Sequence, residues 1–196
     1  MPYHHGNLRR ALLDAALDTI ATDGVAALNL RALARRCGVS HAAPTHHFGD
    51  RQGLLTAIAT EGYDGLAATT AATWAETASF LEVGVSYVRY AVTHPGHFAV
   101  MFRPDLVDPQ DPELIRAQSA SAAMLYGPVD TVATVDGDAA ARRIAATAAW
   151  ALVHGIASLW LQGSLRGDPD GPIGDPEALT RAAARHLFEP RSLTGA

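Results

Sequence analysis

The chain has 196 residues, of which 48% are hydrophobic and 18% are charged, and its formal net charge is −5 at pH 7. This composition excludes an intrinsically disordered chain, and no uninterrupted apolar run reaches the ~18 residues that a membrane-spanning helix requires. A chain of this length buries roughly 70% of the surface that it exposes when unfolded, which is enough for a substantial core.

The charge is unevenly distributed along the chain. Residues 1–60 contain six arginines against four aspartates, a net charge of +2, together with five of the nine histidines. Residues 61–196 contain nine arginines against sixteen acidic residues, a net charge of −7. A mildly basic N-terminal segment beside an acidic remainder is expected if only the first part contacts phosphate groups.

The first residues and the cysteine content of the chain indicate the cellular compartment in which the protein is expected. The first residues, MPYHHGNLRR, are polar and lack the apolar segment of a signal peptide. The single cysteine, Cys37, cannot form a disulfide within the chain and is typical of a reducing compartment. We therefore expect a cytoplasmic protein that does not span a membrane.

The hydrophobic spacing is helical along the whole chain and shows no alternating strand pattern, so it predicts an all-α fold. Asn7 is expected to cap the first helix, and Asp175-Pro176-Glu177 is a strong signal for the start of the last one. Loops are predicted at 104–112, 127–137 and 163–174, where proline and glycine interrupt the pattern. The predicted helices cover residues 8–22, 30–37, 41–48, 51–77, 79–94, 97–103, 113–126, 138–163 and 176–188.

The most specific pattern lies at residues 29–55, NLRALARRCGVSHAAPTHHFGDRQGLL. Asn29 is predicted to cap the helix at 30–37, whose apolar residues and arginines fall on opposite faces. Gly38 is predicted to end that helix, because glycine adopts the left-handed conformation without steric cost. Val39 can fill the corner, and Ser40 is predicted to cap the next helix. Two short helices joined by a glycine-containing turn form a helix-turn-helix, whose second helix can enter a DNA major groove.

Two other interpretations of this stretch exist. The first is a solvated helical hairpin within a larger bundle. The second notes that residues 38–42, GVSHA, are close to the G-x-S-x-G nucleophile elbow. That motif requires a buried strand before the serine, whereas residues 35–37 continue an amphipathic helix. The nucleophile elbow is therefore excluded.

Residues 8–55 resemble the DNA-binding domain of TetR-family transcriptional regulators. In that family the turn and the recognition helix commonly read G-V-S-x-x-x-x-Y-x-H-F-x-x-K-x-x-L. This chain has Arg51 in place of the lysine and Thr45 in place of the tyrosine. Because threonine is shorter than tyrosine, the side chain at position 45 reaches less far towards a phosphate, and His46 can make that contact instead. The residues that match the family pattern are Gly38, Val39, Ser40, His47, Phe48 and Leu54.

The resemblance implies a set of DNA contacts on and around the recognition helix. Arg51, at the start of the next helix, and Arg31 are expected to contact phosphates. Because the recognition helix has no arginine, each base contact is expected to be weaker than an arginine–guanine pair. The predicted DNA-binding residues are Asn29, Arg31, Ser40, His41, Ala42, Thr45, His46, His47 and Arg51.

Motifs for catalysis or metal binding are not found in the sequence. No histidine has a carboxylate three residues before it, as a metal site in a helical bundle would use, and neither a P-loop nor G-x-G-x-x-G is present. His94 and His97 could chelate a metal ion, but Pro95-Gly96 lies between them, and the alternative is a packed surface or a pocket wall. We therefore expect no catalytic residues, no metal and no cofactor.

A second informative stretch is WALVHGIASLW, residues 150–160. Trp150 and His154 share one apolar stripe of a helix, where a histidine is either a satisfied core residue or a ligand contact. The Trp-x-x-x-His-Gly pattern is similar to a C-terminal domain in a subgroup of TetR-like regulators named for these residues, as are His94-Pro95 and Met101-Phe102.

In such regulators the C-terminal helices form both a small-molecule pocket and a dimer interface. The expected effector is small and apolar or aromatic, with His154 as its polar anchor. The candidate effector-binding residues are Tyr87, Tyr90, Phe98, Met101, Phe102, Met124, Trp150 and His154.

The expected protein is a homodimeric, ligand-responsive repressor of a double-stranded DNA operator. Its domains are a helix-turn-helix domain at 1–52, an effector-binding and dimerisation domain at 53–190, and a tail at 191–196. The predicted dimer face consists of Ala140, Ala141, Ile144, Thr147, Ala148, Ala151, Leu179, Ala183 and Leu187. The alternative is a helical small-molecule-binding protein or bundle enzyme without operator binding, which would lack salt-sensitive, sequence-specific duplex binding.

Overall fold

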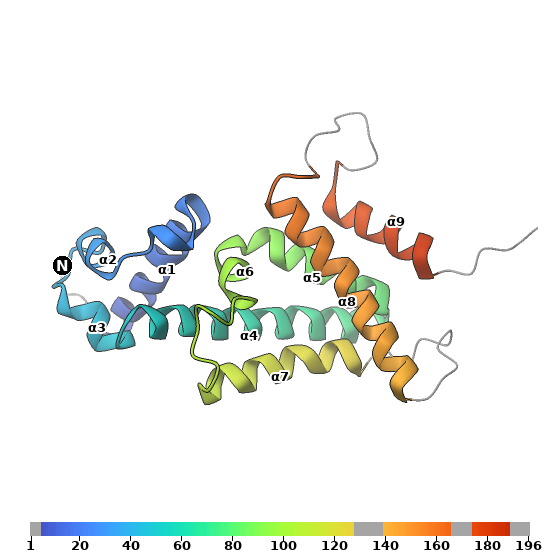
Figure 1. Ribbon diagram of the computed structural model, residues 1–196, viewed down its shortest axis with the longest axis horizontal. Helices are drawn as coiled ribbons and strands as arrows, with labels where there is room; N and C mark the ends of the chain where they lie inside the picture. Colours follow the sequence, from blue (N-terminus) through green and yellow to red (C-terminus); the bar gives the residue numbers. More distant parts are fainter. Residues whose placement is uncertain (1–4, 128–138, 166–173, 189–196) are drawn as a thin grey trace, which may run out of the picture. The chain divides into compact units, whose positions relative to one another are not determined.

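The computed structural model describes residues 5–127, 139–165 and 174–188, with side chains from Leu8 onward. Every regular element in these ranges is helical, which confirms the predicted all-α fold. The elements, coloured along the chain in Figure 1, are α1 (His5–Asp23), the 3-10 helix η1 (Val25–Ala27), α2 (Leu30–Arg36), α3 (Ala42–Phe48), α4 (Arg51–Thr77), α5 (Phe80–Thr93), α6 (Pro95–Met101), α7 (Pro112–Tyr126), α8 (Ala139–Leu161) and α9 (Pro176–Phe188).

Two helix starts differ from the sequence prediction. Helix α1 begins at His5, so Asn7 lies inside the helix and the predicted cap is wrong. Helix α6 begins at Pro95, whereas the sequence pattern predicted an interruption at Pro95-Gly96. Proline suits the first helical position, because its missing N–H is one that a helix leaves unpaired there. Nearly all of the predicted loop at 127–137 and most of that at 163–174 lie outside the described residues.

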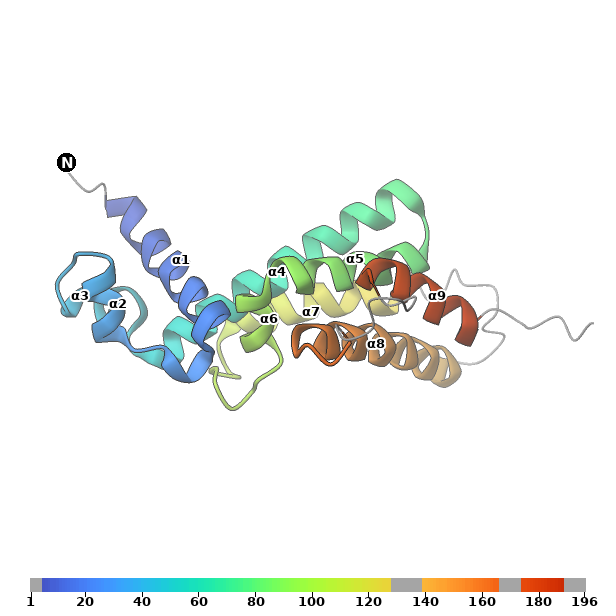
Figure 2. The ribbon, with the colours of Figure 1, turned by 90° about the horizontal axis from the view of Figure 1, so that it is seen from above.

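The chain forms two compact units. Unit 1 contains the described residues up to Gly65 together with His94–Ser121. In it α1 packs against η1, α2, α3 and α6, and α2 packs against α3 (Figure 2). A Cβ atom at Gly96 would lie 2.8 Å from the Leu17 carbonyl oxygen, so α6 lies directly against α1. The largest fully buried side chains of unit 1 are Leu12, Leu13, Leu54, Leu55, Ile58, Val100 and Leu114.

Unit 2 contains Leu66–Thr93 and the described residues from Ala122 onward. In it α5 packs against both α8 and α9, and α8 and α9 contact each other. Two bidentate ion pairs join α9 to α5, from Arg89 to Glu177 and from Arg181 to Glu82. Because exposed ion pairs contribute only about 0–1 kcal/mol each, the packed helix faces supply most of the stability of unit 2.

The units do not follow the domain boundary expected between residues 52 and 53, which falls inside α4 and inside unit 1. That functional boundary stays a prediction. The predicted tail at 191–196 lies outside the described residues.

Helix α8 is long and apolar enough, by length and composition, to cross a membrane, although no long uninterrupted apolar run marks it in the sequence. Only 22% of its most apolar window is buried within the chain. Much of its surface is therefore available to a partner.

Candidate functional site

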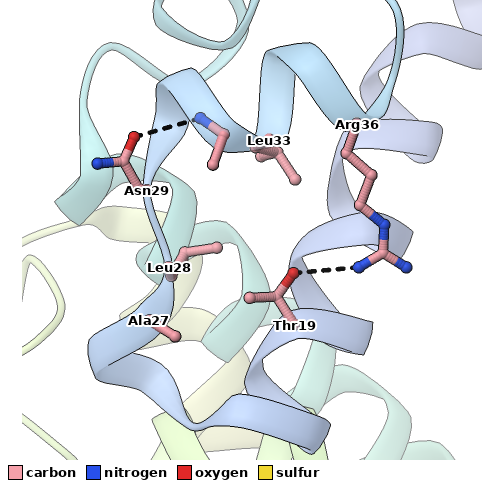
Figure 3. Close-up of a pocket in the computed structure, with 7 residues that line it drawn as sticks. Thr19, Ala27, Leu28, Asn29, Leu33 and Arg36 are labelled. Atoms are coloured by element: carbon pink, nitrogen blue, oxygen red, sulfur yellow. Dashed lines mark hydrogen bonds between the residues drawn. The ribbon is translucent and has the colours of Figure 1, made fainter.

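The first helix of the predicted helix-turn-helix begins as expected. The side-chain oxygen of Asn29 accepts hydrogen bonds from the backbone N–H groups of Arg31 (2.9 Å) and Ala32 (3.3 Å), which confirms Asn29 as the N-cap of α2. Asn29 also lines a small pocket of about 70 Å³ between α1, η1 and α2, where Arg36 donates to the Thr19 hydroxyl over 3.2 Å (Figure 3). The Arg36 bond joins the end of α2 to α1.

The turn between α2 and α3 has a defined hydrogen-bond pattern. The N–H of Val39 bonds to the Ala34 carbonyl (3.0 Å), and that of Gly38 bonds to the Arg35 carbonyl (3.1 Å). Gly38 has φ 68°, the left-handed conformation that this Schellman ending requires. The prediction that Gly38 ends α2 is confirmed.

The start of α3 differs from the prediction. His41, not Ser40, occupies the N-cap position, and no side chain caps the helix. The Ser40 carbonyl instead accepts from the Ala43 N–H (3.0 Å). Because the turn extends one residue further, the predicted Ser40 cap is wrong.

Helix α3 exposes most of the predicted DNA contacts. Pro44 and Phe48 are buried and attach the helix to unit 1, and the Arg9 guanidinium lies 5.2 Å from the centre of the Phe48 ring. Ser40, His41, Ala42, Thr45 and His46 are exposed, and His47 is half-buried. The side chains suited to contacting base edges therefore share the solvent side of one short helix.

A glycine-containing turn connects α3 to α4. Gly49 has φ 76°, and the Asp50 carboxylate accepts from the Gly53 N–H over 2.8 Å, so Asp50 caps the first turn of α4. A Cβ atom on Gly53 would overlap the Phe48 carbonyl oxygen at the end of α3. The backbones of the two helices therefore meet without room for a side chain.

Arg51 makes contacts that the sequence did not indicate. Its Nη2 donates to the Val25 carbonyl (2.8 Å) and its Nε donates to the Leu28 carbonyl (3.2 Å). The guanidinium therefore connects the start of α4 to the segment that precedes α2. The phosphate contact predicted for Arg51 stays a prediction, and these bonds compete with it.

In unit 2, α5 and α8 bring three of the predicted effector-binding residues together. The Tyr87 hydroxyl and His154 Nδ1 are 2.8 Å apart, and the Trp150 and His154 rings are 5.6 Å apart between centres. Tyr87 is buried and His154 is half-buried, and burial lowers the pKa of His154 below its ordinary value. At neutral pH His154 is therefore an uncharged hydrogen-bonding group among aromatic rings.

The remaining predicted effector residues do not all join this cluster. Phe98, Met101 and Phe102 belong to unit 1, where the Phe98 and Phe102 rings are 5.2 Å apart and the Tyr63 hydroxyl donates to the Met101 carbonyl (2.6 Å). Tyr90 on α5 is buried and Met124 on α7 is half-buried, both in unit 2. The eight residues are thus divided between the two units.

Sequence reasoning missed a polar cluster that joins three helices of unit 1. Glu61 on α4 accepts from Arg10 on α1 (2.6 Å) and lies 3.0 Å from His97 Nε2 on α6. Burial lowers the pKa of His97, although the Glu61 carboxylate raises it. Burial raises the pKa of Glu61, but its bonds to Arg10 and His97 outweigh that effect and lower it overall. The only sequence signal was a histidine after Pro95-Gly96.

This cluster predicts how stability depends on pH. A histidine with a lowered folded-state pKa binds protons more weakly than in the unfolded chain, so stability is lost as pH falls below the unfolded value of about 6.5. We expect the free energy of unfolding to decrease as the pH is lowered from about 7 to about 5. Each such histidine contributes at most about 1.4 kcal/mol per pH unit.

Urea unfolding across this range measures the effect, and His97→Gln should flatten the dependence. Glu61→Gln should steepen it, because it removes the carboxylate that raises the pKa of His97. An unchanged pH dependence in His97→Gln would contradict the role of burial at this site.

The fold and the exposed α3 define a helix-turn-helix DNA-binding protein. Residues 12–58 match the family of bacterial regulatory proteins, tetR family, and residues 80–187 match the tetracyclin repressor-like C-terminal domain. The chain belongs to the TetR family of transcriptional regulators, which are not enzymes. The subgroup named for Trp-x-x-x-His-Gly stays a prediction.

Individual relatives agree with this family. The chain is 30% identical over 186 residues to the HTH-type transcriptional regulator BetI of Paraburkholderia xenovorans, covering 92% of each chain. A solved protein of unknown function from Rhodococcus sp. RHA1 is 37% identical, with a TM-score of 0.76 over 96% of each chain. The TetR-family regulator PfmR of Thermus thermophilus shares the fold at 20% identity, with a TM-score of 0.63 over 88% of this chain and 93% of PfmR.

Proposed function

We propose that this regulator is a cytoplasmic, ligand-responsive repressor that binds a pseudo-palindromic operator as a homodimer. The observation that carries the proposal is an exposed apolar face on α8 and α9. Ile144 is 70% exposed and Leu187 is 61% exposed, and Leu159 and Phe188 are each 44% exposed. Burying such a face against a second copy of the chain removes apolar surface from water.

The spacing of accessible residues along α8 supports a helix-to-helix interface. Ala140, Ile144, Thr147, Ala148 and Ala151 follow the i, i+4, i+7, i+8 and i+11 positions of one helical stripe, and none of them is buried. Small residues on this stripe allow a second helix to approach closely. A two-fold dimer presents two recognition helices, so the operator half-sites would be centred about one helical turn apart, roughly 10 base pairs or slightly more.

The cluster around His154 supports ligand binding in unit 2. Helix α8 carries both this cluster and the accessible stripe, so a ligand that moves α8 changes the proposed dimer face. Tyr87 and Trp150 place aromatic rings beside the imidazole of His154, which suits a small aromatic or apolar ligand with a hydrogen-bonding atom. To release DNA, the ligand must bind the non-DNA conformation more tightly.

The test begins with genomic fragments that the purified protein retains, followed by release of those fragments by a panel of small aromatic compounds. We expect His154→Ala to fold and bind DNA but to need at least about tenfold more ligand for release, as expected when a hydrogen bond worth about 1.4 kcal/mol is lost.

The matched variant Tyr87→Phe keeps the ring and removes only the hydroxyl that faces His154, so a smaller increase is expected. If His154→Ala responds at the wild-type ligand concentration, His154 is a core residue and not the anchor. A protein that retains no DNA fragment would contradict the repressor itself.

A further inference from the structure

The arginines of residues 8–60 fall into two groups by their contacts. Arg10 is held by Asp14 and Glu61, each over 2.6 Å. Arg36 at the end of α2 donates to the Asp18 carboxylate on α1 over 2.9 Å. Arg9 lies over the Phe48 ring and Arg51 bonds to backbone carbonyls. These four arginines hold helices of unit 1 together.

Arg31 and Arg35 are different. Both are exposed on α2, and among the residues that the structure describes neither side chain has a hydrogen-bond or ion-pair partner. They are four residues apart, so they lie on one face of α2, opposite the buried Leu33. Like charges at this spacing destabilise a helix, and an external anion relieves that repulsion.

The contacts of Arg51 give it an internal role. Its two donors reach carbonyls at both ends of the segment from Val25 to Leu28, and Leu28 is buried. Arg51 is also the first residue of α4, which follows α3 after two residues. The side chain therefore sets where α2 begins relative to the end of the recognition helix.

We propose that Arg31 and Arg35 together form the phosphate-contacting pair of this DNA-binding unit, and that Arg51 positions α2 and α3 and contacts no phosphate. The proposal rests on the DNA-binding function of the family and identifies which cations carry it. In a helix-turn-helix the first helix crosses the DNA backbone, and guanidinium groups match phosphate geometry in a bidentate way. Arg35 is thereby added to the DNA contacts and Arg51 is removed from them.

The salt dependence of DNA binding tests this assignment, because each neutralised phosphate contributes about 0.9 to the slope of log K against log salt. The probe is a fluorescent random-sequence duplex of about 30 base pairs, roughly three helical turns, titrated with the full-length protein. Each substitution removes one contact from each subunit, so we expect Arg31→Ala and Arg35→Ala each to reduce the slope by about two per bound dimer, and the double variant by about four.

Arg51→Ala and Arg51→Lys should both keep the wild-type slope. Arg51→Lys is the critical variant. Lysine keeps the positive charge that a phosphate contact would need, but it lacks the planar guanidinium that bonds to the Val25 and Leu28 carbonyls together. We also expect Arg51→Lys to lose at least about tenfold in preference for a fragment selected by the wild-type protein over the random duplex, because α3 is displaced. A thermal melt of each variant establishes that it is folded.

Arg116→Ala is the matched control, since Arg116 is an exposed arginine that pairs with Asp64 and Glu113. It should leave the slope unchanged. A slope reduced by about two per bound dimer in Arg51→Ala and restored in Arg51→Lys would overturn the proposal, as would an unchanged slope in Arg35→Ala. These outcomes are distinct from failure of ligand-dependent release, which leaves the DNA contacts untouched.

Discussion

Replacing Ile144 and Ala148 together by glutamate is expected to produce a folded monomer that binds operator about 10²–10⁴-fold more weakly than the wild-type protein. Both side chains are exposed on the same stripe of α8, so a single chain tolerates the charges. A dimer would have to bury them without partners, which is strongly unfavourable. The loss in affinity follows because the second half-site is no longer bound by a linked subunit.

Sedimentation at micromolar protein concentration measures the assembly, and a titration of the retained genomic fragment measures affinity. The matched control is Ala120→Glu, which places a charge at an exposed alanine of α7, outside the proposed interface. At a protein concentration low enough for both to be monomeric, the double variant and the control should melt at similar temperatures. A wild-type protein that is already monomeric at micromolar concentration would refute the homodimer.

Gly53→Ala is expected to give the largest loss of stability from a single methyl group. The added Cβ atom would overlap the Phe48 carbonyl oxygen, which is backbone and cannot rotate away. Either α3 or the first turn of α4 must move, at a cost of about 2–3 kcal/mol. Because α3 carries the proposed base contacts, operator affinity should fall together with stability.

Urea unfolding and DNA titration of Gly53→Ala measure both effects. Gly155→Ala provides the comparison, because Gly155 lies inside α8 and an added Cβ atom there would meet nothing within 4 Å beyond its own helix backbone and chain neighbours. That substitution should raise stability by about 0.5–1 kcal/mol, the usual gain of alanine over glycine in a helix. Equal stability of Gly53→Ala and the wild-type protein would contradict the close approach of α3 and α4.

Features determined by nearby residues were predictable from the sequence. Asn29 caps α2 and Gly38 ends it, because both effects depend on backbone groups only two to five residues away. The boundaries of α4 and the start of α9 were predicted correctly for the same reason. The exposed side of α3 follows from its period, since Pro44 and Phe48 are four residues apart and both are buried.

Features that depend on distant residues were not predictable. Arg51 bonds to carbonyls 23 and 26 residues earlier in the chain, and nothing in its neighbourhood in the sequence distinguishes it from a phosphate-binding residue. The cluster of Arg10, Glu61 and His97 joins three helices for the same reason. The aromatic residues of the predicted pocket were grouped by size and type, which does not tell which helices bring them together.

The contacts across unit 1 have a consequence for exchanging DNA-binding modules between regulators. The first turn of α4 is attached to the loop after α6, because Gln52 donates to the Val107 carbonyl (3.0 Å) and the Asp108 N–H donates to the Thr56 hydroxyl (2.9 Å). A chimera joined at residue 52 would separate the helix-turn-helix from these attachments and from Glu61. A chimera that carries residues 1–65 together with 94–121 would keep the core of unit 1, and the DNA-binding specificity would be transferred with it.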